Sequence, residues 1–352
     1  MTSSTARVPS GIDEVTPQWL SDVLGTQVCS ARPERIALDT GFSSLLYRVH
    51  LTGSPDVPAT VIVKLPAESE ARGAMEMLGG YAREVAFYRT VAGHAPMRTP
   101  HVYAAHIADN SAEFVLMLED LQDWENADHL AGLSMERAQL CIAQLAGLHA
   151  WSLDPANYAL VQPFPGIDTP IAREIFLPAF ASGWQVYRDH CSGPVPAEVA
   201  AFAEHFAERA PAALPVMTER SMLLHGDIRA DNMFFNGNQL KVVDYQFACR
   251  GVGAADIGYL VSQGLPTQTR TGQDERLLRE YLEHLAAQGI TDYSFDDAWR
   301  HYRFAVAYLM VLPVITLIGW DAMTERSRSL CLTLTDRAVA TIDQTDALEA
   351  FA

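Results

Sequence analysis

The sequence predicts an α+β protein with two lobes, a small β-sheet lobe at residues 1–120 and a large, mainly helical lobe at residues 121–352. Alternating apolar and polar residues, typical of strands, recur up to about residue 120, whereas helical periodicity dominates the remainder. A polar segment within 223–260 interrupts the helical part. We therefore expect a small antiparallel sheet with one key helix, followed by a helical lobe that carries a reactive loop.

The composition restricts the class of protein. The chain has 352 residues, 49% of them hydrophobic, and its 25 Lys and Arg against 43 Asp and Glu give a formal charge of −18. This excess of acid disfavours nucleic acid or an anionic membrane as a partner, because both bind basic surfaces. The five scattered cysteines form no CxxC pair, and the N-terminus lacks the apolar core of a signal peptide, so we expect reduced thiols in a cytoplasmic protein.

The first lobe begins with an expected helix over residues 12–30, capped by Thr16 ahead of Pro17. A turn of small residues follows and leads into an alternating strand at 45–51. Backbone N–H groups in such a turn can contact phosphate, although an ordinary hairpin turn has the same composition. The candidate phosphate-binding residues are Gly41, Ser43 and Ser44.

A lysine lies within the next expected strand, at 60–65. Burying Lys64 there is costly unless it meets an anion, although many strand lysines simply reach solvent. The following helix, 81–91, carries Glu84 on its apolar stripe, where a carboxylate also needs a partner. We therefore expect Lys64 and Glu84 to form an ion pair.

The remaining elements follow in chain order. A strand pair at 101–107 and 113–118 completes the sheet, and Ser134 is the expected cap of the first long helix of the second lobe. His149 on that helix is expected to be a hydrogen-bonded packing residue. Further helices are expected at 170–190, 196–209, 274–288, 296–320 and 325–345. Residues 304–320 are uncharged, but they are short for a membrane span and contain Pro313, so we expect a buried helix and no membrane span.

The polar segment contains His225-Gly226-Asp227, then Asn232, then Asp244. Asn236-Gly237 favours a tight hairpin that brings Asp244 back beside Asn232. Oxygen donors gathered in this way suit Mg²⁺, which keeps part of its coordination shell for water and phosphate. Each residue alone is more often an ordinary loop residue, but the combined spacing favours a site.

This spacing, H-G-D-x-x-x-x-N followed by an Asp after a hairpin, resembles the catalytic and metal loops of the protein-kinase-like fold. Gly226 in place of Arg, and Asp-Tyr-Gln in place of Asp-Phe-Gly, indicate the small-molecule branch. That branch contains aminoglycoside phosphotransferases, choline kinases and ecdysteroid-kinase-like proteins. The R-A-D-N sequence and the long apolar helix favour the ecdysteroid-kinase-like group.

The resemblance implies an ATP-dependent kinase that transfers the γ-phosphate to a hydroxyl of a small organic acceptor, with Mg²⁺ as second cofactor. Asp227 would orient or deprotonate the hydroxyl, and Arg229 would touch the γ-phosphate. Asn232 and Asp244 would hold the metal, while Lys64, paired with Glu84, would bind the α- and β-phosphates. The backbone near Glu119 and Leu121 would bind adenine at a hinge, and Asp256 would brace the catalytic loop.

The acceptor stays open at this stage. Aromatic residues on the later helices are compatible with an apolar pocket for a lipid-like, steroid-like or macrolide-like alcohol, and equally with core packing: Trp184, Tyr187, Trp299, Tyr302, Tyr308 and Trp320. A nucleotide-binding pseudokinase or scaffold is the alternative function, and a protein kinase is disfavoured because no Asp-Phe-Gly or Ala-Pro-Glu segment occurs. The sequence leaves the oligomeric state undetermined.

Overall fold

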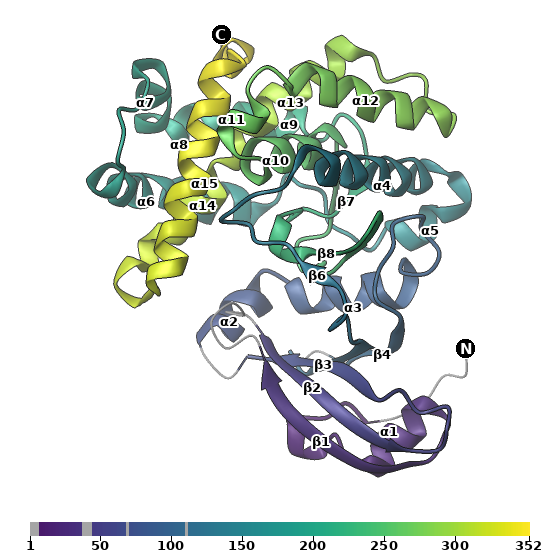
Figure 1. Ribbon diagram of the computed structural model, residues 1–352. Coiled ribbons are helices and arrows are strands. Elements are labelled where there is room, and N and C mark those ends of the chain that lie inside the picture. Colours follow the sequence, from purple (N-terminus) through teal and green to yellow (C-terminus); the bar gives the residue numbers. More distant parts are fainter. Residues whose placement is uncertain (1–6, 37–43, 68–69, 110–111) are drawn as a thin grey trace. The chain divides into compact units, whose positions relative to one another are not determined.

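The computed structural model describes residues 7–36, 44–67, 70–109 and 112–352. These residues form two compact units, coloured along the sequence in Figure 1. The first unit contains Met1–His94, Arg98–Trp124 and Lys241–Phe247, and the second contains Ala95–Met97, Glu125–Leu240 and Ala248–Ala352. The division of the chain into lobes at residue 120 stays a prediction.

The first unit is built on an antiparallel sheet with the strand order β1-β2-β3-β5-β4. Its strands are β1 (Val28–Ile36), β2 (Ser44–Gly53), β3 (Thr60–Pro66), β4 (Val102–Ile107) and β5 (Phe114–Glu119). Its helices are η1 (Ile12–Glu14), α1 (Pro17–Leu24), α2 (Glu70–Met77) and α3 (Gly80–Thr90).

Alternation along β3 decides which side chains enter the core of this unit. Val61, Val63 and Leu65 join Trp19 and Leu20 of α1 in one buried cluster. Because successive strand residues point to opposite faces, Lys64 lies on the other face of the sheet.

The expected leading helix over 12–30 is wrong in its extent. Thr16 does cap α1 by accepting from Trp19 N–H, but the helix ends at Leu24. Gly25 adopts a left-handed backbone conformation with φ of 66°, which ends the helix, and β1 begins at Val28.

The second unit is mainly helical. Its α-helices are α4 (Met135–Leu153), α5 (Tyr158–Val161), α6 (Leu177–His190), α7 (Ala197–Glu204), α8 (Phe206–Arg209), α9 (Ala213–Val216), α10 (Ala254–Gly264), α11 (Thr267–Arg270), α12 (Asp274–Ala287), α13 (Phe295–Leu309), α14 (Val311–Thr316) and α15 (Glu325–Gln344). Short 3-10 and π segments are η2 (Pro155–Asn157), η3 (Ala172–Phe176), η4 (Ala210–Ala212), η5 (Ala230–Asn232), η6 (Leu317–Ala322) and η7 (Ala347–Phe351).

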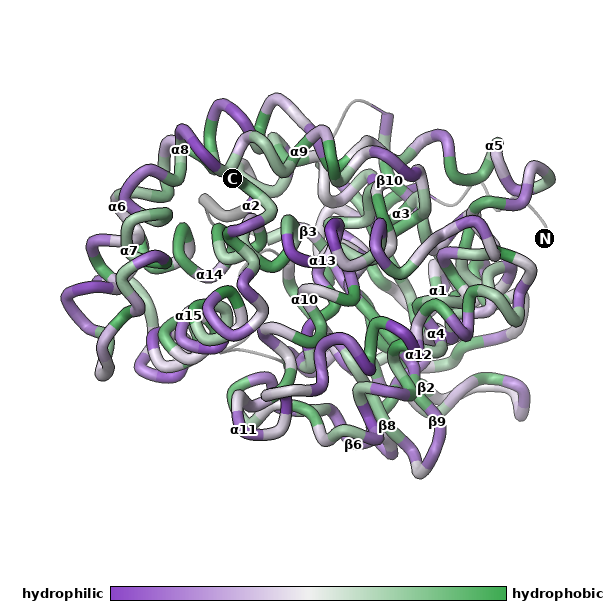
Figure 2. The backbone as a smooth tube through the Cα atoms, turned by 90° about the horizontal axis from the view of Figure 1, so that it is seen from above, coloured by the Kyte–Doolittle hydropathy of each residue, from purple (hydrophilic) through white to green (hydrophobic). Residues whose placement is uncertain are grey.

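Short strands accompany these helices: β6 (Glu125–Asn126), β7 (Met222–Leu224), β8 (Met233–Asn236), β9 (Gln239–Val242) and β10 (Cys249–Gly251). They pair in the orders β10-β7 and β6-β8-β9, so the hairpin expected around Asn236-Gly237 is present. Gly237 has the positive φ, 56°, that such a turn requires. Every residue of α10 is buried, and its hydrophobic trace is visible in Figure 2.

The long helix expected over 296–320 is wrong as a single element. It breaks after Leu309 into α13, α14 and η6. Pro313 explains the break, because it has no N–H for an intrahelical bond and its ring clashes with the carbonyl four residues earlier. Phe295–Ala322 is nevertheless apolar and long enough to count as a membrane-span candidate, but 61% of its most apolar window is buried inside the protein. This is the behaviour of a core helix.

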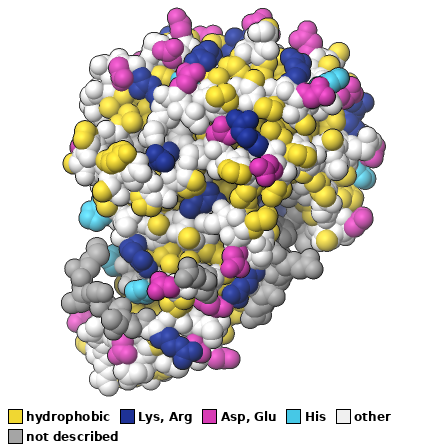
Figure 3. All heavy atoms as spheres, turned by 180° about the vertical axis from the view of Figure 1, so that it is seen from behind, with side chains coloured by type: hydrophobic (Ala, Val, Ile, Leu, Met, Phe, Trp, Pro, Cys, Tyr) yellow, Lys and Arg dark blue, Asp and Glu magenta, His cyan; other side chains and the backbone are white. Residues whose placement is uncertain are grey.

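The surface carries charges of both signs. On the face drawn in Figure 3, acidic and basic side chains are interspersed among apolar ones.

Ser134 caps α4 as expected, because its side chain accepts from Arg137 N–H.

Candidate functional site

Lys64 is held by two carboxylates within the first unit. Its Nζ lies 2.7 Å from Glu84 Oε1 on α3 and 3.4 Å from Asp244 Oδ1. The lysine is 6% exposed and Glu84 is 1% exposed. The structure thus joins the strand lysine and the helix glutamate that the sequence paired, and it adds Asp244 to them.

This cluster has unusual electrostatics. Burial alone would lower the pKa of Lys64, but the charges of Asp244 and Glu84 outweigh it and raise that pKa, so the amine stays protonated. Burial raises the pKa of Glu84 to about 7, although the Lys64 charge opposes the rise. Lys64 therefore contacts two carboxylates, one of which titrates near neutral pH.

The backbone at Asp244 is held in a rare conformation. Asp244 has φ of 67°, in the left-handed region that non-glycine residues seldom adopt. The next residue, Tyr245, is fully buried and stacks on Phe87 of α3, with ring centroids 3.4 Å apart. Non-glycine residues in this region cluster at functional sites. The stack fixes the turn that presents Asp244 to Lys64.

The loop predicted to be catalytic follows β7 in the second unit and runs from His225 to Asn232. Asp256, near the start of α10, accepts from the backbone N–H of His225 at 2.7 Å and of Gly226 at 3.0 Å. His149 Nε2 lies 3.3 Å from the same carboxylate, so His149 is a buried, hydrogen-bonded histidine as expected. These contacts hold the pKa of Asp256 below its usual value although burial acts to raise it.

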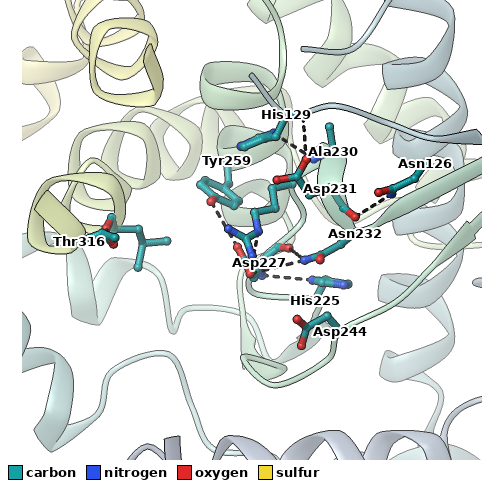
Figure 4. A network of polar contacts seen from close by, with 12 residues as sticks. Asn126, His129, His225, Asp227, Ala230, Asp231, Asn232, Asp244, Tyr259 and Thr316 are labelled. Atoms are coloured by element: carbon teal, nitrogen blue, oxygen red, sulfur yellow. Dashed lines mark hydrogen bonds and ion pairs between the residues drawn. The ribbon is translucent and has the colours of Figure 1, made fainter. Parts of the chain in front are cut away.

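Three side chains contact Asp227, and Figure 4 labels two of them, Tyr259 and Asn232. Tyr259 O–H donates to Oδ1 at 3.3 Å, and Arg229 Nε lies 3.4 Å from Oδ2. Asn232 Nδ2 donates to the Asp227 backbone carbonyl at 2.9 Å. Tyr259 and Arg229 therefore orient the carboxylate of Asp227, and Asn232 holds its backbone.

Asn232 and Asp244 each carry a side-chain oxygen of the kind that binds Mg²⁺. Because Asn232 uses its amide nitrogen to hold Asp227, its side-chain oxygen is the atom left to coordinate a cation. Asn232 belongs to the second unit and Asp244 to the first. Within the described ranges, no group of three or more His, Cys, Asp or Glu side chains is suited to hold a metal alone.

Three of the five expected nucleotide-binding residues outside the Lys64 pair lie among the described residues. Gly41 and Ser43 lie outside the described residues. Ser44 is the first residue of β2, and its side chain is buried. Glu119 uses its backbone N–H to bond His101 O at 2.9 Å, and its carboxylate binds Lys241. Leu121 is buried, and its carbonyl accepts from Trp124 N–H.

Comparison with known proteins identifies the family. The profile of the ecdysteroid kinase-like family matches residues 39–290. The chain belongs to the ecdysteroid kinase-like family. This match confirms the resemblance found in the sequence, and it places the chain among phosphotransferases.

Solved structures confirm the protein-kinase-like fold of this family member. An ethanolamine kinase of Plasmodium vivax is 13% identical, with 88% of this chain and 82% of that chain covered and a TM-score of 0.55. The GDP complex of aminoglycoside 2'-phosphotransferase-IIIa is 18% identical, with 89% and 94% covered and a TM-score of 0.54. At these identities the likeness shows the fold alone.

One curated relative is similar in sequence over a short stretch. The methylthioribose kinase of Geobacillus thermodenitrificans is 28% identical over 85 residues, which are 24% of this chain and 21% of that enzyme. The chain therefore matches only a minor part of the length of this relative.

Sequence reasoning missed two residues that hold the loop between His225 and Asn232 in this ecdysteroid kinase-like protein. Tyr259 follows Asp256 by three residues on α10, so the helical spacing alone would have placed both on the side facing the loop. His129 Nδ1 accepts from Ala230 N–H at 3.0 Å (Figure 4), and no motif marks it because its partner lies about a hundred residues away.

Three of the aromatic residues considered for an acceptor pocket have core partners. Trp184 and Tyr187 on α6 pack against each other, with ring centroids 5.0 Å apart, and Tyr187 donates to Asp336. Tyr302 is fully buried and donates to Asp274 at 2.7 Å. These three side chains therefore belong to the packing of the second unit.

Proposed function

We propose that this protein is an ATP-dependent kinase that transfers the γ-phosphate to a hydroxyl group of a small organic acceptor. The observation that carries the proposal is the buried Lys64–Glu84 pair with Asp244 beside it. A buried ion pair is costly to desolvate and is weak support for stability alone. An amine held in this way is suited to bind phosphate oxygens.

The proposed roles follow from the chemistry of each group. Asp227 holds the acceptor hydroxyl and takes its proton, and Arg229 beside it stabilises charge on the transferred phosphoryl group. Lys64 binds the α- and β-phosphates, with Glu84 fixing its amine. Bound Mg²⁺ would neutralise phosphate charge, and Asn232 and Asp244 are its proposed ligands.

Nucleotide binding would use the start of the sheet and the stretch that follows β5. Backbone groups near Gly41, Ser43 and Ser44 would contact phosphate, and those at Glu119 and Leu121 would contact adenine. Since Glu119 N–H already bonds within the sheet, its carbonyl is the better candidate for an adenine contact. The structural relative solved with GDP supports nucleotide binding as a property of this fold.

The proposal also covers the acceptor of the enzyme and its location in the cell. Its acceptor is a hydroxyl-bearing small molecule, as the names of the ethanolamine and methylthioribose kinases suggest for those relatives. All five cysteines fall in the described part of the chain and none forms a disulfide, which supports a cytoplasmic location.

The test is ADP release from ATP and Mg²⁺ across hydroxylated metabolites, sterols, amino alcohols, sugars and antibiotics. Asp227→Asn should lower the rate with the best acceptor by roughly 10²- to 10³-fold, since it removes an interaction worth about 3–4 kcal/mol in the transition state. Asp321→Asn changes the same charge at an exposed position and should leave the rate intact. Equal rates for wild type and Asp227→Asn would favour the alternative, a nucleotide-binding scaffold.

A further inference from the structure

Gln246 is a buried amide next to the Lys64 cluster. It follows Asp244 by two residues, stands where protein kinases have the glycine of Asp-Phe-Gly, and is 2% exposed. A buried primary amide needs partners for two N–H donors and one carbonyl, because unpaired polar groups destabilise the folded chain. The partners of Gln246 therefore show what a glycine in its place would lose.

One partner lies at the start of β2. Gln246 Nε2 donates to Ser44 Oγ at 3.1 Å, and both residues are buried in the first unit. Ser44 pairs with Pro66 in the β2–β3 ladder, two residues beyond Lys64. The amide thus links the turn after Asp244 to the end of the sheet where the lysine lies.

The Gln246 side chain also acts on the carboxylate that holds Lys64, because it helps to counter the rise in the pKa of Glu84 that burial causes. The backbone of Gln246 also approaches α3, since a Cβ added at Gly80 would lie 3.4 Å from the Gln246 carbonyl oxygen. Ser44 and the start of α3 are therefore both next to the chain segment that carries Asp244.

We propose that Gln246 is a positioning residue for nucleotide binding, which fixes the start of β2 relative to Asp244 so that the Lys64 amine stays between its two carboxylates. The inference rests on the proposed function, because it assumes that Lys64 binds nucleotide phosphates. The charge of the side chain at position 246 matters as well as its size. A glutamate there would add a third carboxylate near the Lys64 ammonium group.

The test is the affinity of the full chain for ADP with Mg²⁺, measured by isothermal titration calorimetry without any acceptor. Gln246→Met keeps the length of the side chain and removes its donors, and it should weaken ADP binding about tenfold. Gln246→Glu should weaken it further at pH 7. Gln263→Met is the matched control, because Gln263 is equally buried in the second unit and donates to Leu309 O. It should lower the melting temperature and leave ADP affinity unchanged.

The Ser44 contact is tested by a double-mutant cycle. Ser44→Ala removes the same hydrogen bond, so the double variant with Gln246→Met should bind ADP no more weakly than Gln246→Met alone. Fully additive losses would contradict the coupling. ADP affinity equal to wild type in Gln246→Met, or an equal loss in Gln263→Met, would overturn the inference. Failure of wild type to bind ADP would instead count against the proposed function.

Discussion

Asp256 offers the sharpest test of how the second unit supports catalysis. Its two oxygens accept the backbone N–H groups of His225 and Gly226, and His149 contacts the same carboxylate. Asp256→Asn keeps one carbonyl oxygen but turns an N–H group toward a backbone donor. The variant therefore loses one charge-assisted hydrogen bond and leaves one buried donor unpaired.

The structure sets the size of the effect. A hydrogen bond to a charged group contributes about 1.5–3 kcal/mol, and an orphaned buried donor costs about 1–3 kcal/mol. Because the two losses overlap, we expect Asp256→Asn to lower the free energy of unfolding by about 2–4 kcal/mol. This loss is smaller than the total stability of about 5–15 kcal/mol that is typical of folded domains, so the variant should still fold. A displacement of about 1 Å in the loop carrying Asp227 should cost roughly 100-fold in kcat.

The assay pairs denaturant unfolding with steady-state kinetics, and Asp274→Asn is the control. Asp274 is a buried carboxylate of the same unit that accepts from Tyr302 and pairs with Arg270, outside the catalytic loop. Both variants should lose stability, whereas kcat should fall only for Asp256→Asn, with KM for ATP little changed. A similar loss of kcat in both variants would refute the reasoning, because general destabilisation would then explain it.

Two further predictions concern other buried groups. Lys64→Met should weaken ADP binding at least 100-fold, about 3 kcal/mol. Adding Glu84→Gln should restore the melting temperature without restoring ADP binding, because the unpaired carboxylate is then neutral. Recovered ADP binding in calorimetry would contradict the role of the lysine. Burial and nearby arginine charge hold the pKa of His129 well below its ordinary value of 6.5. Below pH 6.5 the unfolded chain therefore takes up a proton that the folded chain does not. The free energy of unfolding should then fall by up to about 1.4 kcal/mol per pH unit. His129→Asn, which keeps an acceptor for Ala230 N–H, should flatten the drop in melting temperature between pH 7 and pH 5, and an unchanged drop would count against this explanation.

Helix starts were predicted better from the sequence than helix ends. Thr16 and Ser134 cap helices in the structure as in the sequence, because a capping side chain bonds a backbone N–H three residues away. The end of α1 and the break after Leu309 were missed, although Gly25 and Pro313 mark both places. In each case the predicted helix was extended on the basis of its apolar periodicity, past a residue whose backbone conformation ends or breaks a helix.

The sequence by itself determined the family, the fold class and the pairing of Lys64 with Glu84, because these depend on residue types at short, fixed spacings and on the cost of burying charge. Only the tertiary structure decided that Asp244 shares the lysine, that Gln246 bonds Ser44, and that His129 and Tyr259 hold the catalytic loop. Most of these contacts join residues that lie about a hundred or more positions apart. Such contacts depend on how distant segments pack, and no local pattern in the chain records that packing.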